Sequence, residues 1–292
     1  MPTHKLYMDS IKSCYLKEFN AEVTNITGNM IELDKTLFYP IGGGQDWDQG
    51  IIKHHNKQIN VLEVKGREKV THLVESNHDL EIGQTIEGQI DWKRRYAHMK
   101  MHTAQHLISA VVYDLFDGVR TVGNQIRHNR SRIDFNPINF DDLMLTELIT
   151  ETNERIKRGA ELKVKIMSRD EINEIMPPER TNMDLVPPNV ENLRVVVIGD
   201  NLDLCPCAGT HIQNISEIGE VEFLGKKSKG KGTQRFSYTL KDFPRGAKQS
   251  WVGDVWYNQG GIVVKTQGEH KNLALGTNSN GFELEWDATV QI

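Results

Sequence analysis

Short apolar runs with polar residues between them fill the first ninety positions. Turn signals such as Gly28-Asn29, His55-Asn56 and Lys65-Gly66 separate the runs. The pattern predicts strands at residues 21–26, 30–33, 50–53, 59–64, 70–74 and 85–90. Short strands at this spacing are typical of a small β-barrel.

The apolar period changes to that of a helix at Asp91. Asp is a favoured N-cap, and apolar side chains then recur on one helical face from Met99 to Leu115. Gly118 provides the stop. The sequence therefore predicts one long helix directly after the last predicted strand of the barrel.

Capping residues predict two further helices. Asp141 or Asp142 begins one that ends near Gly159, and Ser168 with Glu171 has the spacing of a capping box for a short one. The remaining apolar segments predict strands at 131–135, 162–166, 193–198, 221–224 and 235–240. We therefore expect an α+β fold in which helices pack on one mostly antiparallel sheet.

The change of pattern near residue 90 predicts separate domains in this chain of 292 residues. We expect a β-barrel domain at 1–90, an α+β domain at 91–240 and a β-rich extension at 241–292. In the extension, extra strands are predicted by Trp251, Trp256, Tyr257, the run 260–265 and the segment 282–286. The extension would contact RNA by aromatic stacking or form a dimer interface, which leaves monomer and homodimer both open.

The net charge and the cysteine content exclude some classes of protein function. A formal net charge of −5 argues against a protein that coats nucleic acid without selectivity. Basic residues nevertheless cluster at 93–95, 120–132 and 226–231, where they would hold phosphates or form ordinary solvated surface. Three cysteines make no disulfide framework, and we find no secretory signal or apolar run of membrane-spanning length, so we expect a cytoplasmic protein.

Two short histidine motifs carry the candidate chemistry. His102 and His106 lie four residues apart and share one face of the predicted helix, while Cys207 and His211 follow a predicted strand. Together they form the nitrogen and sulfur ligand set that zinc accepts. The alternative is a pair of partly exposed helix histidines. His98, one turn earlier, is expected behind the ligands, toward a substrate or at the surface.

Four motifs in a fixed order resemble a known family. They are Phe38-Tyr-Pro-Ile-Gly-Gly-Gly-Gln45, the helix Arg95 to Leu107 with its histidine pair, Pro206-Cys-Ala-Gly-Thr-His211 and Ser228-Lys-Gly-Lys-Gly-Thr-Gln-Arg235. Over about residues 1–240 the chain resembles the freestanding alanyl-tRNA editing proteins of the AlaX type. These proteins are similar to the editing domain of alanyl-tRNA synthetase.

The resemblance implies an activity, a partner and a cofactor. The activity is hydrolysis of the ester that joins a wrong amino acid, serine first and glycine second, to the acceptor stem of alanine tRNA. A translation-factor-like barrel would precede an editing domain that holds Zn²⁺ on His102, His106, Cys207 and His211. Zinc would either activate water or orient the amino group of the substrate. Because four protein ligands close a tetrahedral site, His106 or His211 would give way to substrate.

Further site residues are expected on the same motifs. Gln45, Thr103 and Gln105 would form a polar wall that binds the hydroxyl of serine and is left unpaired by alanine. Gln105 stands where the family often has threonine, which leaves the fine specificity open. We also expect substrate contact from Thr210 and from the loop Gly42, Gly43 and Gly44, whose backbone can approach a ligand closely. The expected tRNA contacts are Lys93, Arg94, Lys229, Lys231 and Arg235.

Two other function classes stay open. A non-catalytic RNA-binding module would use zinc only to hold its fold together. A zinc hydrolase of small esters or amides would not need the lysine-rich stretch at 226–231. The sequence contains no His-Glu-x-x-His motif, which argues against a metalloprotease.

Overall fold

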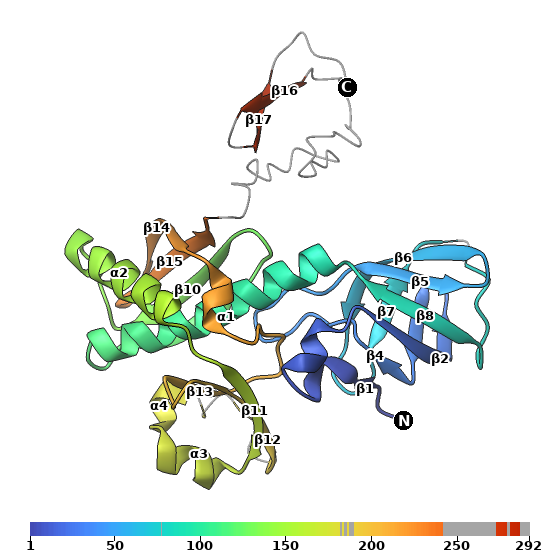
Figure 1. The fold of residues 1–292 in the computed structure, drawn as a ribbon, viewed down its shortest axis with the longest axis horizontal. Coiled ribbons are helices and arrows are strands. Elements are labelled where there is room, and N and C mark those ends of the chain that lie inside the picture. Colours follow the sequence, from blue (N-terminus) through green and yellow to red (C-terminus); the bar gives the residue numbers. More distant parts are fainter. Residues whose placement is uncertain are drawn as a thin grey trace. The chain divides into compact units, whose positions relative to one another are not determined.

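The computed structural model describes residues 1–76, 78–181, 183, 186 and 190–241, and the strands at 273–278 and 281–286. The chain divides into two compact units, Met1–Thr239 and Leu240–Ile292. The first unit contains a closed barrel, a long helix, a four-stranded sheet and a three-stranded sheet (Figure 1). The expected α+β class is confirmed.

The first ninety residues form the predicted barrel. Its strands close in the order β2-β3-β7-β6-β5-β8, and neighbouring strands are antiparallel. Phe19, Ala21 and Val23 alternate with exposed residues and fill the interior, and closure leaves no unpaired edge. The strands are β2 (Glu18–Thr27), β3 (Met30–Leu33), β5 (Gly50–His54), β6 (Lys57–Lys65), β7 (Thr71–Val74) and β8 (Thr85–Ile90).

Short elements before and beside the barrel are not predicted from the sequence. They span two to four residues each, too few to show an apolar period. The N-terminal strand β1 pairs in parallel with β4. These elements are β1 (His4–Lys5), the 3₁₀ turns η1 (Leu6–Met8) and η2 (Lys12–Tyr15), and β4 (Lys35–Thr36).

The long helix α1 (Trp92–Leu115) leads from the barrel into the rest of the first unit (Figure 1). Asp91 caps it as predicted, because its carboxylate accepts a hydrogen bond from the backbone N–H of Arg94 at 3.1 Å. Helix α2 (Asp142–Arg158) packs beside α1 and is capped by Asp141. No helix among the described residues combines the length and the apolar character needed to span a membrane.

The strands after α1 belong to two sheets rather than the single sheet expected. One has the order β14-β15-β10-β9 and the other the order β11-β12-β13. The prediction of one sheet fails because periodicity marks strands but not their partners. The strands are β9 (Arg120–Gln125), β10 (Ser131–Asn136), β11 (Leu162–Met167), β12 (Leu193–Ile198), β13 (Asp203–Pro206), β14 (Val221–Gly230) and β15 (Thr233–Leu240).

Short helices pack on the three-stranded sheet. The predicted capping box forms at Ser168 and Glu171 and begins α3 (Arg169–Ile175), which α4 (Pro178–Thr181) follows. Apolar side chains of these helices, including Ile172 and Met176, pack on Val195 and Val197 of β12. The turn η4 (Ile215–Ile218) contacts α1 and α2.

In the second unit the structure describes one antiparallel hairpin, β16 (Leu273–Asn278) and β17 (Gly281–Trp286). The strand predicted at 282–286 lies within β17. The predictions for Trp251, Trp256, Tyr257 and the run 260–265 lie outside the described residues.

His72 is a fully buried titratable group in the barrel wall. Its Nδ1 donates to the carbonyl of Ile31 at 3.0 Å, and its Nε2 lies 2.9 Å from the hydroxyl of Thr36. Burial disfavours the imidazolium and lowers the pKa of His72 from 6.5 to about 4. The unfolded chain therefore takes up the proton first as the pH falls, and stability present above pH 6.5 is lost between pH 6.5 and about 4.

We predict that this group lowers the free energy of unfolding by about 2 kcal/mol between pH 7 and pH 5. A His72→Asn variant, which does not titrate, should lose about that much less over the same interval. Urea unfolding at the two pH values measures the difference. Equal losses in the native protein and the variant would contradict the assignment.

Candidate metal centre

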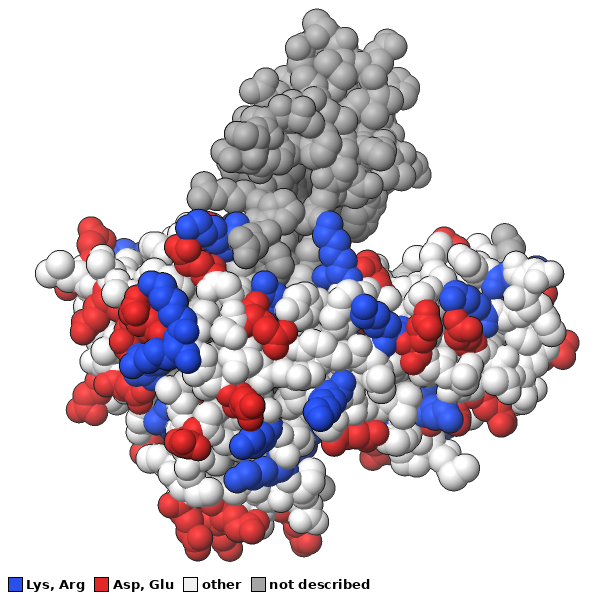
Figure 2. All heavy atoms as spheres, viewed as in Figure 1, with Lys and Arg blue, Asp and Glu red and all other residues white. Residues whose placement is uncertain are grey.

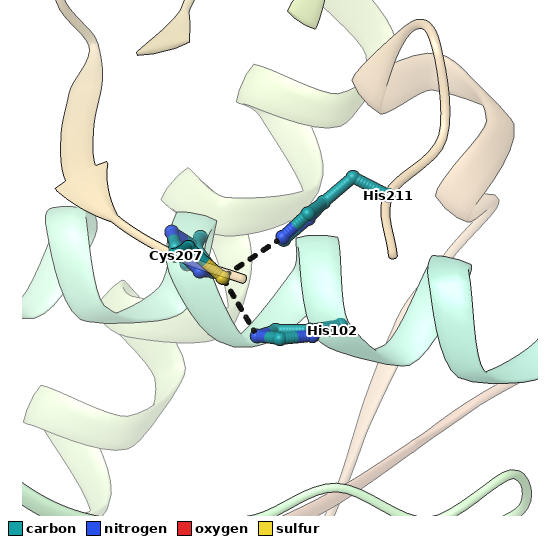
Figure 3. A group of neighbouring side chains, drawn as sticks. His102, Cys207 and His211 are labelled. Atoms are coloured by element: carbon teal, nitrogen blue, oxygen red, sulfur yellow. Dashed lines mark hydrogen bonds between the residues drawn. The ribbon is translucent and has the colours of Figure 1, made fainter. Parts of the chain in front are cut away.

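The two predicted histidine motifs meet at one point. His102 and His106 lie on α1, and Cys207 and His211 lie in the segment that follows β13. Their ligand atoms all lie within 4.8 Å of one another. Figure 3 shows the Cys207 thiol between two imidazoles, with Sγ 3.6 Å from Nε2 of His102 and 3.3 Å from Nε2 of His211. About a hundred residues of intervening chain therefore return to the face of α1 that carries the histidine pair.

Each of the three histidines is held through Nδ1. His102 donates to Oε1 of Gln45 at 2.7 Å, and His106 donates to Oδ2 of Asp203 at 2.8 Å. His211 lies 3.1 Å from the hydroxyl of Thr103. With Nδ1 occupied, each ring has Nε2 free as its ligand atom. Such partners fix the tautomer and orientation of metal-binding histidines.

The electrostatics of the cluster favour a thiolate among imidazoles. Burial alone would raise the pKa of Cys207, but His102 and His211 hold it well below its usual value. Burial lowers the pKa of His211 to about 3. For His106 burial acts in the same direction, but hydrogen bonds with Asp203 and Cys207 outweigh it and raise the pKa to about 10. One sulfur and three nitrogen donors, buried and oriented, fit zinc.

The glycine-rich loop positions Gln45 beside His102. The backbone of Gly44 accepts from the N–H of Ile126 at 2.7 Å and has a φ of +85°, and a Cβ there would lie 1.6 Å from Oδ1 of Asn124. Only glycine fits this close approach. The loop is thereby fixed against the end of β9, and Gln45, fully buried, also donates to Thr210 Oγ1 at 3.1 Å.

Gly209 packs against the ring of His102 in the same cluster. A Cβ at this position would lie 2.2 Å from Cε1 of His102. The Ala-Gly-Thr connection between Cys207 and His211 therefore packs directly on an imidazole, which explains the glycine in the motif.

A cavity of about 590 Å³ opens beside the cluster. One wall is the segment from Tyr39 to Gly43 between β4 and β5. Helix α1 contributes His102, Gln105 and His106, and the segment from Cys205 to Gly209 completes the lining. A cavity of this size is typical of a small-molecule or cofactor site. The cluster therefore borders a space that a substrate can enter.

The four polar side chains expected to contact substrate divide into two groups. Gln105 lines the cavity, is 7% exposed and donates to Ser109 Oγ at 2.9 Å. Gln45, Thr103 and Thr210 are fully buried behind the histidines and do not line the cavity. In the structure these three side chains hold the cluster, because their polar atoms bond to His102, to His211 and to one another.

Asp203 is a site residue that the sequence does not predict. Its carboxylate accepts a hydrogen bond from His106. The two residues lie 97 positions apart, so no local spacing in the sequence indicates this contact. The only local signal is its place four residues before Cys207, at the start of the strand that leads into the motif.

His98 is a buried core histidine. Neither of its ring nitrogens has a partner among the described residues, and its ring packs edge-on against His128 at 5.9 Å between centroids. Burial and the neighbouring Arg94 hold the pKa of His98 well below its usual value. A surface position is therefore wrong, and His98 does not line the cavity.

The residues expected to contact tRNA differ in whether their side chains are already bonded within the protein. Lys93, Lys229 and Lys231 are exposed or partly exposed, whereas Arg94 donates to the carbonyl of Trp47. Arg235 is engaged in a two-pronged pair with Asp134 at 2.7 and 2.8 Å. Basic and acidic side chains are interspersed over the face shown in Figure 2.

We predict that Gln45→Leu weakens zinc binding by about 10- to 100-fold, because His102 loses the partner that fixes its ring. Competition against a chelator measures the affinity. Gln49→Leu is the matched control, since Gln49 donates to the backbone of Leu62 and touches no histidine. Equal affinities of the two variants would refute the positioning role.

Comparison with known proteins gives concordant matches. A family described as the threonyl and alanyl tRNA synthetase second additional domain matches residues 193–237, and one described as class II (A) tRNA synthetases matches residues 5–94. The chain is 39% identical over 243 residues to the alanyl-tRNA editing protein AlaX-M of Saccharolobus solfataricus, and the match covers 82% of this chain and 99% of that protein.

Two further relatives extend the comparison. The AlaX-M protein of Methanosarcina barkeri is 34% identical over 78% of this chain and 96% of its own length. An alanine–tRNA ligase of Methanococcus aeolicus is 32% identical over 77% of this chain but only 24% of its own length. The similarity to the ligase is thus confined to one part of a much longer protein.

Proposed function

The chain belongs to the family of alanyl-tRNA editing proteins of the AlaX type, and we propose that it hydrolyses the ester of alanine tRNA charged with a wrong amino acid. Serine is the first expected substrate and glycine the second. The observation that carries the proposal is the buried cluster of three histidines and one cysteine beside a cavity of about 590 Å³. The family match supplies the substrate class, and the cluster supplies the chemistry.

The proposed cofactor is zinc, held by His102, His106, Cys207 and His211. When bound, zinc would either polarise the ester carbonyl and lower the pKa of water, or orient the amino group of the substrate. The chain's own contribution is to orient the donors: Gln45, Thr103 and Asp203 keep each Nε2 directed at the cluster. The fully buried Gln45 and Thr103 also keep water from these hydrogen bonds.

Gln105 is the proposed element of selectivity. Its side chain borders the cavity next to both α1 histidines and is oriented by Ser109. A seryl group offers a hydroxyl that can bond to this polar wall, whereas an alanyl group leaves the wall unpaired, which costs about 1–3 kcal/mol for a buried group. Selectivity against alanine would therefore come from an unmet hydrogen bond rather than from size.

Deacylation of seryl-, glycyl- and alanyl-tRNA with the alanine acceptor stem tests the proposal. We expect the native protein to release serine fastest and to spare alanine, and we expect Cys207→Ala to lose at least about 100-fold in rate because a donor is missing. Cys205→Ala is the control for folding and metal content, since Cys205 is not in the ligand group. No release by the native protein, with zinc bound, would leave a non-catalytic module with structural zinc.

We further propose that exposed lysines of the β14–β15 hairpin bind the tRNA backbone. Lys229→Ala with Lys231→Ala should weaken tRNA binding and lower the dependence of log K on log salt by about 2, one for each phosphate that the variant no longer neutralises. Filter binding at several salt concentrations measures both. A hydrolase of small esters would show no such change in its rate, so an unaffected tRNA affinity would favour that class.

A further inference from the structure

The cavity beside the cluster carries cations that the chemistry at the cluster does not use. Lys5 and Arg67 line it from the barrel side. Neither makes an ion pair within 4.0 Å in the described part of the chain. The third cation of the lining, Arg180, is occupied by Asp114 and by the carbonyl of Leu202.

The fold holds Lys5 and Arg67 on one side of the barrel. The N–H of Thr3 donates to the carbonyl of Glu68 at 2.8 Å, and Thr3 Oγ1 accepts from the N–H of Val70 at 3.0 Å. These bonds join the strand that carries Lys5 to the β6–β7 turn that carries Arg67. Gly66 has a φ of +107°, and a Cβ there would lie 2.0 Å from the carbonyl oxygen of Lys69, so the turn is tight and specific.

Charge around the cavity favours an anionic ligand on this wall. Asp203 is the one carboxylate in the described lining, and it is engaged by His106. Lys5 is half-buried, and burial lowers its pKa although Glu68 acts in the opposite direction. A half-buried ammonium without a paired carboxylate has lost part of its hydration, and a bound anion would compensate for that loss.

The anion cannot be the amino acid. In an aminoacyl ester the carboxylate is consumed in the bond, and the free ammonium would be repelled by Lys5 and Arg67. The anions that remain are the phosphodiesters of the RNA strand that carries the ester. A cavity of about 590 Å³ also exceeds what a seryl group alone would fill.

We propose that Lys5 and Arg67 form a phosphate subsite that holds the single-stranded 3′ end of the RNA, so that the barrel positions the ester at the cluster. This inference rests on the proposed function for the identity of the RNA. Lys5 and Arg67 act as positioning residues and take no part in the bond cleavage. The subsite is separate from the exposed lysines of the β14–β15 hairpin.

Binding of the uncharged trinucleotide CCA tests the subsite without requiring catalysis. We expect Lys5→Ala with Arg67→Ala to lose about tenfold or more in affinity and to lower the salt dependence by about 1.4, which corresponds to two phosphates neutralised on a single strand. Lys53→Ala with Lys57→Ala removes the same charge from the β5–β6 hairpin, where both lysines are paired with carboxylates. This control should bind like the native protein.

Hydrolysis of two esters provides the second measurement. The Lys5 and Arg67 variant should lose about tenfold or more in kcat/KM on seryl-CCA but keep the native rate on seryl-adenosine, which has no phosphate. Trinucleotide affinity equal to that of the native protein, or equal losses on both esters, would overturn the subsite. If the native protein binds the trinucleotide through these residues but cleaves neither ester, the subsite stands and the editing function fails.

Discussion

A buried ion pair between Arg95 and Asp48 fixes the start of α1 against the barrel, and the geometry of the candidate metal centre depends on it. Both side chains are fully buried. The guanidinium also donates to the carbonyls of Cys14 and Leu37, and the carboxylate accepts from the N–H of Tyr39 at 2.7 Å. Removing one partner of such a pair leaves a buried charge and typically costs about 3–5 kcal/mol. The pair therefore favours one position of α1 against the barrel, because any other position would leave a buried charge unpaired.

Helix α1 and the segment that carries Asp48 are also in contact at the cluster, where His102 bonds to Gln45. His102 follows Arg95 by seven residues, or about 10.5 Å along the helix, and Gln45 precedes Asp48 by three. The ion pair thus sets the position at which Gln45 reaches His102. Arg194 adds a further link, because it donates to the carbonyls of Met8 and Cys207 and so joins the N-terminal segment to the ligand loop. The segment between β4 and β5 thus contributes to the candidate metal centre through Gln45.

The proposed RNA substrate is a polyanion, whereas the protein has a formal net charge of −5. The proposed RNA contacts use a few cations at particular points, and the three histidines of the cluster are buried. Inside the protein, His102 and His211 hold the pKa of Cys207 well below its usual value, which favours the thiolate that a metal ion would bind. Under the proposed function, selectivity would therefore come from local contacts at the cavity wall and not from the overall field of the protein.

The sequence by itself determined the longer elements and the candidate donor set. Alternation of apolar residues marked the six strands of the barrel, capping residues marked the starts of α1, α2 and α3, and the spacing of the motifs marked His102, His106, Cys207 and His211, because all of these signals are local. Tertiary structure decided the rest. Gln45, Asp203 and Thr103 lie 57, 97 and 108 residues from the histidines they hold. No period or spacing reports such contacts, since they exist only once the barrel, α1 and the ligand loop have packed.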